Sequence, residues 1–543
     1  MPRVRQRSTG ILASLLLVNG RVLTMTGATT QAVAVSDDRV LATGDDRDLL
    51  HLRGPKTAVI DLGGRLAMPG FTDSHVHLRA LGHVLTRVDL SPAHSLSAAL
   101  SLVAARAKRV PVGEWITGGG FDKNRWGDSF PDRGDLDRVA PGHPVALHTR
   151  DGHSVWLNSV GLRRCSITRE TQVPSGGVIA RDAAGEPTGI LQESAISLIY
   201  NCPDLRARGA DDGELLIGLR SLLRSGITSV HAMEESDTFS GLQKLREAGR
   251  LPLRVTLYRS RAELDSMIAA GVRSGFGDEW LRIGGLKMLV DGSLGSQTAW
   301  MYQPYESPAQ AAEPCGVPVL HGEELRETVR RAAAAGLACA IHAIGDRANA
   351  EALDALEQTR DLPTPLPHRI EHAQLLRPAD IPRLARLNTV ASMQPCHILG
   401  DIDTAERYWG ARSRWAYPIR SLLRVGANVI FGSDAPVETH DVMAGVYAAV
   451  RRQTLDGRPT DGWYREEEGI SRLAALRAYT TAPARATGES RFKGALAPGY
   501  LADIVVPSEN VLRVGPHRLA KPRVEMVIVG GRVRYRRTAT RQR

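Results

Sequence analysis

At 543 residues the chain is far longer than one minimal domain, and its 43% hydrophobic content supports a large buried core. The formal net charge is +10, but Lys and Arg are scattered along the chain, whereas nucleic-acid binding usually needs them clustered. We therefore expect no nucleic-acid partner, and we interpret the densest basic run, at 532–543, as a solvated chain end.

The N-terminal residues superficially resemble the start of a signal peptide. Three arginines precede the apolar run 11–18, but no small-residue cleavage site follows. The turn signal Asn19-Gly20 comes next, and it is typical of a hairpin between two strands. We therefore predict a strand at 11–18. No apolar run approaches the length of a membrane span, so we expect no membrane association.

The cysteines favour a reducing compartment. Their number is odd, they are widely spaced, and no CxxC pair occurs among Cys165, Cys202, Cys315, Cys339 and Cys396. This pattern suits the cytosol, so we expect a cytoplasmic protein without disulfide bonds. A homodimer is a candidate assembly.

Both ends of the chain have the texture of short strands broken by turns. It occurs from about 14 to 66 and again from about 487 to 535. Because chain termini are often close in space, we expect a single small β-sandwich built from residues 1–66 and 487–543. Two unrelated β caps are the alternative.

Residues 67–486 alternate strand-like apolar runs with amphipathic stretches, as expected of βα units around a parallel sheet. The predicted fold class is α/β, a (β/α)8 TIM barrel. Eight barrel strands are expected near residues 70–77, 227–233, 252–258, 282–290, 337–343, 368–373, 388–394 and 427–434. The gap between the first two strands is too long for an ordinary connection, so it should hold a large insertion at about 80–215, over the catalytic face.

The first barrel strand carries two histidines, His75 and His77, in FTDSHVH. Residues two apart on a strand point to the same side, so both imidazoles can reach one ion. A structural pair of histidines is the alternative. The position favours a site, because active-site residues of these barrels come from the carboxyl ends of strands.

A lysine, Lys287, interrupts the apolar run of the predicted fourth barrel strand, LKMLVDG. Burying an unpaired ammonium is costly, but lysine loses its proton readily when buried, which arginine does not. We infer that carbon dioxide carboxylates Lys287 and that the two carbamate oxygens bridge two cations. A lysine paired with a barrel carboxylate is the alternative.

Three further candidate ligands end later strands: His342 in AIHAIGDRA, His372 in RIEHAQ and Asp434 in VIFGSDAP. Any one alone would more often be a core or capping residue. Together with the first-strand histidines and Lys287 they combine neutral nitrogens with hard oxygens, a set suited to zinc or a similar divalent ion.

This set of residues resembles that of the amidohydrolase superfamily. The phrases MPGFTDSHVH, KMLVDGSLGSQTA, HAIGDRA, RIEHAQ and GSDAPVE are similar to its YtcJ-like, amidohydrolase-3 branch, which includes N-substituted formamide deformylases. The resemblance extends nearly end to end. It implies a barrel that holds one or two divalent ions, with zinc the expected metal.

These residues suggest a mechanism for hydrolysis of a carbon–nitrogen bond. A divalent ion lowers the pKa of water from about 15.7 towards about 7. Asp434 would accept the proton of the water and deliver it to the departing nitrogen. The metal, with His342 or His372, would polarise the carbonyl. The neighbouring Glu371 alternates to the opposite side of its strand from His372, so we interpret it as a structural partner.

Candidate substrate contacts come from the insertion and from loops after the barrel strands. They are Trp126, Asp151, His153, Glu193, Gln297, Gln394 and His397. Polar groups at a turn suit either pocket lining or loop packing. Trp126, with Phe121 and Trp156, could form an apolar wall or the insertion's own core.

The leading functional hypothesis is a hydrolase of a small non-peptide amide, such as an N-substituted formamide. The same ligands would equally serve a cyclic amide, an imide or a carbamate. A different class of protein is a barrel that has lost catalysis and acts as a scaffold. The complete ligand set argues against that reading.

Overall fold

The computed structural model describes residues 11–538 except 122–125, 127–129, 150–153, 175–176, 201, 203–204, 206–211, 296 and 307–313. The chain forms two compact units. One combines Met1–Leu78 with Leu219–Arg543, and the other is Arg79–Gly218. In the sequence, the second unit falls within the long segment between the first two barrel strands.

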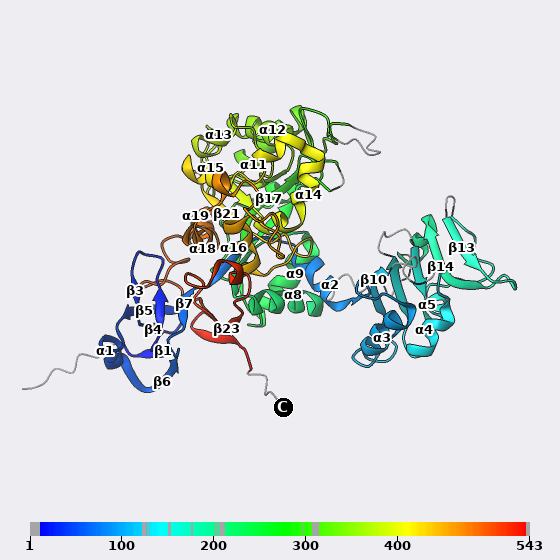
Figure 1. The fold of residues 1–543 in the computed structure, drawn as a ribbon, viewed down its shortest axis with the longest axis horizontal. Coiled ribbons are helices and arrows are strands. Elements are labelled where there is room, and N and C mark those ends of the chain that lie inside the picture. Colours follow the sequence, from blue (N-terminus) through cyan, green and yellow to red (C-terminus); the bar gives the residue numbers. More distant parts are fainter. Residues whose placement is uncertain are drawn as a thin grey trace, which may run out of the picture. The chain divides into compact units, whose positions relative to one another are not determined.

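The eight predicted barrel strands form one parallel sheet (Figure 1). They are β8 (Phe71–Val76), β15 (Ile227–Glu234), β16 (Arg254–Ser260), β17 (Leu281–Leu289), β18 (Cys339–Ala343), β19 (Arg369–His372), β20 (Val390–Met393) and β21 (Val429–Phe431). They lie side by side in chain order. A parallel bridge between Val76 and Ala435 joins the two edges, so the sheet is nearly closed. The predicted α/β barrel is confirmed.

Helices alternate with the barrel strands. They include α8 (Asp212–Arg224), α9 (Ser236–Glu247), α10 (Leu264–Ala269), α11 (Gly322–Ala334), α12 (Asp346–Glu357), α13 (Ile381–Arg386), α14 (Ile398–Trp409), α15 (Ile419–Arg424), α16 (Val442–Arg451), α17 (Arg465–Glu468), α18 (Arg472–Ala478) and α19 (Thr481–Ala486). In α11 the buried residues Leu325, Val329 and Ala332 recur at helical spacing, while Glu323 faces solvent. This amphipathic pattern gives the helix one face to pack against the rest of the unit.

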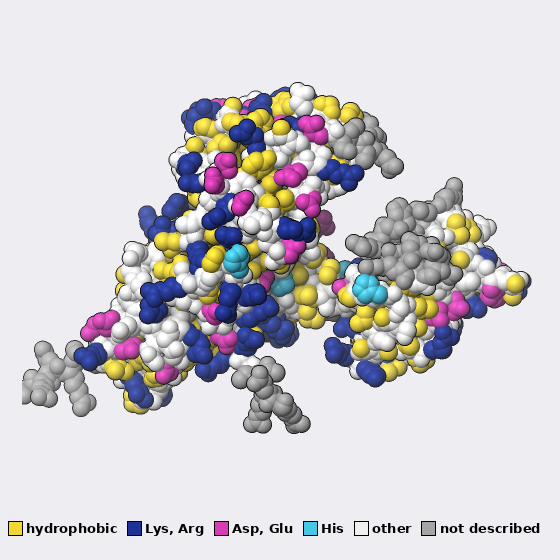
Figure 2. All heavy atoms as spheres, in the orientation of Figure 1, with side chains coloured by type: hydrophobic (Ala, Val, Ile, Leu, Met, Phe, Trp, Pro, Cys, Tyr) yellow, Lys and Arg dark blue, Asp and Glu magenta, His cyan; other side chains and the backbone are white. Residues whose placement is uncertain are grey.

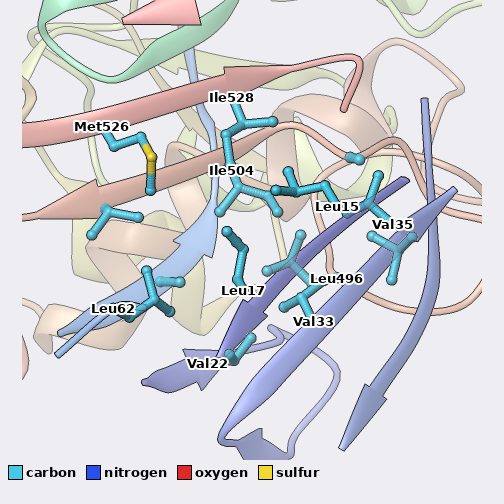
Figure 3. Close-up of a cluster of buried hydrophobic side chains, with 14 residues drawn as sticks. Leu15, Leu17, Val22, Val33, Val35, Leu62, Leu496, Ile504, Met526 and Ile528 are labelled. Carbon is cyan, nitrogen blue, oxygen red and sulfur yellow. The ribbon is translucent and has the colours of Figure 1, made fainter. Parts of the chain in front are cut away.

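Strands from both termini build the small β-sandwich, as predicted. One sheet contains β1 (Ala13–Val18), β4 (Ala32–Ser36), β5 (Arg39–Gly44) and β6 (Arg53–Asp61). The other contains β2 (Arg21–Leu23), β3 (Thr29–Thr30), β7 (Leu66–Pro69), β22 (Ile504–Pro507), β23 (Val524–Val529) and β24 (Arg532–Arg536). Leu17 and Val33 from the N-terminal segment pack with Ile504 and Ile528 from the C-terminal one (Figure 3). Neither terminal segment could bury this apolar surface alone.

The predicted hairpin at Asn19-Gly20 is wrong, although the strand before it is present. β1 pairs with β4 and β6, whereas β2 pairs with β3 and β7 in the other sheet. Asn19 adopts a left-handed conformation with φ 55°, as the turn signal requires. The turn therefore carries the chain from one sheet of the sandwich to the other instead of folding two strands together.

The second compact unit has a sheet and cores of its own. Its sheet contains, in spatial order, β13 (Gly177–Arg181), β14 (Pro187–Glu193), β12 (Ser154–Leu157), β11 (Val145–Thr149), β10 (Ile116–Phe121) and β9 (Val88–Asp89). Its helices include α3 (Leu96–Ala107), α4 (Arg133–Val139) and α5 (Ser159–Arg164). Side chains cap all three: Ser95 accepts from Ala98 N, Asp132 forms a capping box, and Asn158 accepts from Gly161 N.

On the face drawn in Figure 2, the basic side chains do not form one continuous stripe. Figure 2 shows Lys and Arg spread over the visible face among hydrophobic and acidic side chains. Among the helices that the structure describes, none combines the length and apolarity needed to cross a membrane.

A buried ion pair joins the barrel to the sandwich. The Arg254 guanidinium donates to both carboxylate oxygens of Asp503, at 2.7 and 3.1 Å, and lies 4.6 Å from the Trp280 ring. Both charged side chains are almost fully buried. Breaking such a pair leaves a charge uncompensated, which costs about 3–5 kcal/mol. We expect Arg254→Ala to lower the free energy of unfolding by that amount, measured by urea denaturation.

The exposed pair Arg246–Asp278 provides a matched control. Its atoms are 2.7 Å apart, but the two side chains are 42% and 49% exposed. Solvent screens exposed pairs, so Arg246→Ala should cost less than about 1 kcal/mol. Equal losses in the two variants would contradict the importance given to the buried pair.

Candidate metal centre

The six predicted ligands lie at or just beyond the carboxyl ends of barrel strands. They are His75 in β8, His77 after it, Lys287 in β17, His342 in β18, His372 in β19 and Asp434 after β21. Because the strands are parallel, these ends share one end of the barrel, where the active sites of this fold occur.

Asp434 is the centre of this group. The Nε2 atoms of His77 and His75 lie 3.3 and 3.5 Å from its Oδ1, and Nε2 of His397 lies 3.3 Å from its Oδ2. Burial acts to raise the pKa of Asp434, but the adjacent imidazoles of His397 and His77 hold that pKa well below its usual range. The carboxylate is therefore ionised at neutral pH.

Two of the candidate ligands have left-handed backbone conformations. The φ angles are 70° at His372 and 60° at Asp434, and the Asp434 amide donates to the His75 carbonyl at 2.7 Å. Such a conformation costs a non-glycine residue about 1–3 kcal/mol. The surrounding barrel holds the backbone strained at the two strand ends that carry these donors.

The imidazoles lie close together and are mostly neutral. The ring centroid of His372 lies 5.1 Å from that of His75 and 4.4 Å from that of His342. Burial, reinforced by the charge of Lys287, lowers the pKa of His75 to about 4 and that of His342 to about 3. Neutral imidazole is the form that binds a metal.

Hydrogen bonds fix the tautomers of the two first-strand histidines. Nδ1 of His75 lies 2.6 Å from a Glu371 oxygen, and Nδ1 of His77 lies 3.2 Å from the Met233 carbonyl oxygen. Each Nδ1–H therefore donates, which leaves the Nε2 lone pair directed at Asp434. An imidazole lone pair and a carboxylate oxygen repel each other at 3.3–3.5 Å. They therefore need a cation between them, either a proton or a metal ion.

The residues present fit a divalent ion. Two groups of three side chains each bring their ligand atoms within 4.8 Å of one another. One group is His75, His77 and Asp434, and the other is His372, His397 and Asp434. Within the part of the chain that the structure describes, His75 Nε2 and His372 Nδ1 are buried without a hydrogen-bond partner. Buried polar atoms are nearly always satisfied, so their lone pairs are available for coordination.

Metal binding should release protons. Burial acts to lower the pKa values of His77 and His397, but Asp434 raises both above the ordinary histidine value. Without metal these groups are protonated below their raised pKa values, so a metal must displace protons there. Proton release per ion should therefore decrease as pH rises through these pKa values. Calorimetric titration of the metal-free protein in buffers of different ionisation enthalpy measures it, and no release near pH 6 would contradict the assignment.

The amine of Lys287 is buried, and burial changes its protonation. Burial, partly offset by Glu371 and Asp434, lowers the pKa of its amine to about 8. Among the described residues this amine forms no hydrogen bond or ion pair, although the Glu371 and Asp434 carboxylates act on its pKa, so carboxylation and pairing with a carboxylate both stay predictions. At pH 7 about one amine in ten is neutral, and that form can react with carbon dioxide.

Glu371, interpreted from the sequence as a structural partner, contacts a candidate ligand that the sequence did not pair with it. Its carboxylate, which is fully buried, accepts from His75 and pairs with Arg369. The Arg369 guanidinium also donates to the Ser74 carbonyl and to Ser392 Oγ, and it stacks on the Tyr258 ring at 4.8 Å. Strand alternation does not determine the direction of the His372 side chain, because β19 ends at His372, where φ is positive. The Glu-His dipeptide was the available signal.

We expect Glu371→Gln to weaken metal binding about 10–100-fold, because the amide no longer fixes the His75 ring as a carboxylate does. The dissociation constant for zinc, measured by competition with a chelating dye, tests this. Glu371→Asp keeps a carboxylate and should lose less. Glu323→Gln, at a side chain 83% exposed on α11, serves as the control. An unchanged constant in Glu371→Gln would rule out a role in positioning His75.

A second buried carboxylate organises the loop after β17. Asp291 accepts from the backbone N–H groups of Trp300, Ile344 and Gly345 at 2.8–3.0 Å. Nε2 of His342 donates to the Gly292 carbonyl at 2.9 Å, which leaves His342 Nδ1 as the lone-pair atom. This loop therefore orients His342.

The predicted substrate contacts fall in different environments. Asp151 and His153 lie outside the described residues, and Glu193 is the last residue of β14. Trp126 stacks on Phe121 at 5.3 Å in a hydrophobic core of the second unit, so core packing accounts for it. Gln297 and Gln394 are buried in the barrel unit, and Gln394 donates to the Ser392 carbonyl. Among those that the structure describes, His397 lies beside Asp434 in the candidate metal centre. Substrate contact by these residues stays a prediction.

A parallel (β/α)8 barrel with imidazole and carboxylate donors at one end defines the class of metal-dependent TIM-barrel hydrolases. The sequence pattern of the amidohydrolase family matches residues 58–535, and the chain belongs to this family. The resemblance seen in the sequence is confirmed.

Known proteins are similar over almost the whole chain. The amidohydrolase YtcJ of Bacillus subtilis (strain 168) is 30% identical over 524 residues, 94% of this chain and 97% of that protein. The N-substituted formamide deformylase of Arthrobacter pascens is 29% identical over 557 residues, 97% and 99% of the two chains. The crystal structure of a metal-dependent hydrolase from Pyrococcus horikoshii OT3 has a TM-score of 0.75 at 29% identity, covering 92% of this chain and 99% of that one.

Proposed function

We propose that the protein hydrolyses a small non-peptide amide, with an N-substituted formamide as the leading substrate class. The observation that carries this proposal is the arrangement around Asp434. An ionised carboxylate at a barrel mouth faces three imidazole nitrogens, and two donor atoms nearby have no protein partner. The formamide deformylase among the relatives supports the substrate class.

The donor set fits zinc, with one or two ions held by His75, His77, Lys287, His342, His372 and Asp434. When bound, the ion supplies Lewis acidity, which makes hydroxide available near neutral pH and polarises a carbonyl oxygen. Imidazole and carboxylate donors are the ordinary zinc ligands. Carboxylation of Lys287 would add two hard oxygens on the β17 side of the barrel.

The proton chemistry belongs to Asp434. Its carboxylate is ionised at neutral pH, so it can accept the proton that the attacking water must lose. The same carboxyl can then deliver this proton to the departing nitrogen, because an amine leaves only when protonated. In this proposal His342 or His372, whose ring centroids lie 4.4 Å apart, helps the metal to polarise the carbonyl group.

A cyclic amide, an imide or a carbamate is the alternative substrate, since it needs the same donors. A substrate screen distinguishes them. Zinc-loaded protein should release amine from N-substituted formamides, and a chelator should abolish the release. Turnover confined to cyclic amides or carbamates would replace formamides as the substrate class. Metal-free protein that cannot be loaded with zinc would favour a barrel that has lost catalysis.

A further inference from the structure

The barrel strand that carries Lys287 also presents an exposed leucine at the mouth. Lys287 and Leu289 are two residues apart on β17, so their side chains share one side, while the intervening Met288 is buried among the apolar core. The sheet register pairs Leu289 with His342 of β18. Leu289 therefore stands in the same layer as a candidate metal ligand, yet it is 46% exposed.

The segment that bonds to the residue after Leu289 carries two more exposed valines. The amide of Val319 donates to the carbonyl of Val290, the residue after Leu289, at 2.8 Å. Val319 is 57% and Val317 39% exposed. We name Leu289, Val317 and Val319 the β17 rim. Single exposed apolar residues are ordinary, but a group of them beside a site marks a surface that an apolar partner covers.

We infer that the β17 rim holds an apolar N-substituent of the substrate and that Leu289 determines the preferred length of that group. The inference rests on the proposed function. A formamide has only hydrogen on its acyl side, so the bulk of the substrate lies on the nitrogen. When the carbonyl group lies among the candidate metal ligands, the N-substituent extends past the strand ends towards the mouth of the barrel. There β17 ends in Leu289.

The apolar rim predicts a graded preference. Complete burial of one methylene changes affinity about four-fold, and the rim is open to solvent on one side. For N-methyl, N-propyl and N-pentyl formamide, kcat/KM should therefore rise about two- to four-fold per added methylene. Leu289→Ser should flatten this dependence, whereas Leu289→Met should keep it, because methionine preserves the apolar volume.

Leu423→Ser is the matched control. Leu423 is 36% exposed on α15, so the same chemical change is made at an apolar surface residue away from β17. It should retain the wild-type dependence on chain length. Leu289→Thr, which suits a strand, repeats the test if the serine variant folds poorly.

The outcomes separate the two proposals. Hydrolysis of the whole series with a dependence unaffected by Leu289→Ser would overturn the rim assignment and leave the proposed function standing. A preference for charged or strongly polar N-substituents would also overturn the assignment. No hydrolysis of any formamide by zinc-loaded wild-type protein would overturn the proposed function, and the inference with it.

Discussion

We expect Asp434→Asn to lower kcat about 10²–10⁴-fold, while the protein keeps most of its metal. The side chain retains its shape and one oxygen, so coordination near His75 and His77 survives in part. The amide cannot accept a proton from water or return it to nitrogen. General acid–base catalysis contributes about this factor, equivalent to about 3–5 kcal/mol of barrier.

Steady-state kinetics and elemental analysis of metal, both on the same preparation, check this expectation. Asp456→Asn is the control, since Asp456 is an exposed carboxylate that contacts its near neighbours Thr454 and Arg458. A thermal melt establishes that Asp434→Asn is folded. If metal and activity fell in parallel, Asp434 would be a ligand alone; if neither fell, it would be structural.

Lys287→Ala should remove metal and activity together. The alanine variant loses both the amine and any carbamate formed on it, so β17 no longer supplies a donor to the site. We expect at most a small fraction of the wild-type metal content and a loss of activity of about 10³-fold or more, since an activated water requires the metal. Lys287→Arg should not rescue, because a guanidinium stays protonated and cannot form a carbamate.

The carbamate itself can be tested directly. Native mass spectrometry should show one extra carbon dioxide on the wild-type chain, absent from Lys287→Ala. Removing bicarbonate during metal reconstitution should slow recovery of activity. Lys521→Ala, at an exposed lysine, should behave as wild type. Full activity in Lys287→Ala, or an unmodified mass for the active metal-loaded enzyme, would end the carboxylysine proposal.

The sequence by itself determined the barrel, the composite sandwich and the candidate ligands. Each barrel strand is a short apolar run bounded by turns, which is a local property. The spacing of His75 and His77 follows from the two-residue period of a strand. The candidate ligands at strand ends could also be predicted from the sequence, because parallel strands bring their carboxyl ends together whatever the intervening residues are.

Only the tertiary structure decided which groups support the ligands. Glu371 meets His75 across 296 residues of sequence, and barrel closure brings His75 beside Asp434, with the His75 carbonyl accepting from the Asp434 amide. His397, at the end of the 3-10 turn Pro395–His397, reaches Asp434, whereas the sequence indicated only a candidate substrate contact. The turn at Asn19 likewise separates two strands into different sheets. These contacts depend on the closure of the sheets and on positive φ angles at strand ends, so strand periodicity alone could not predict them.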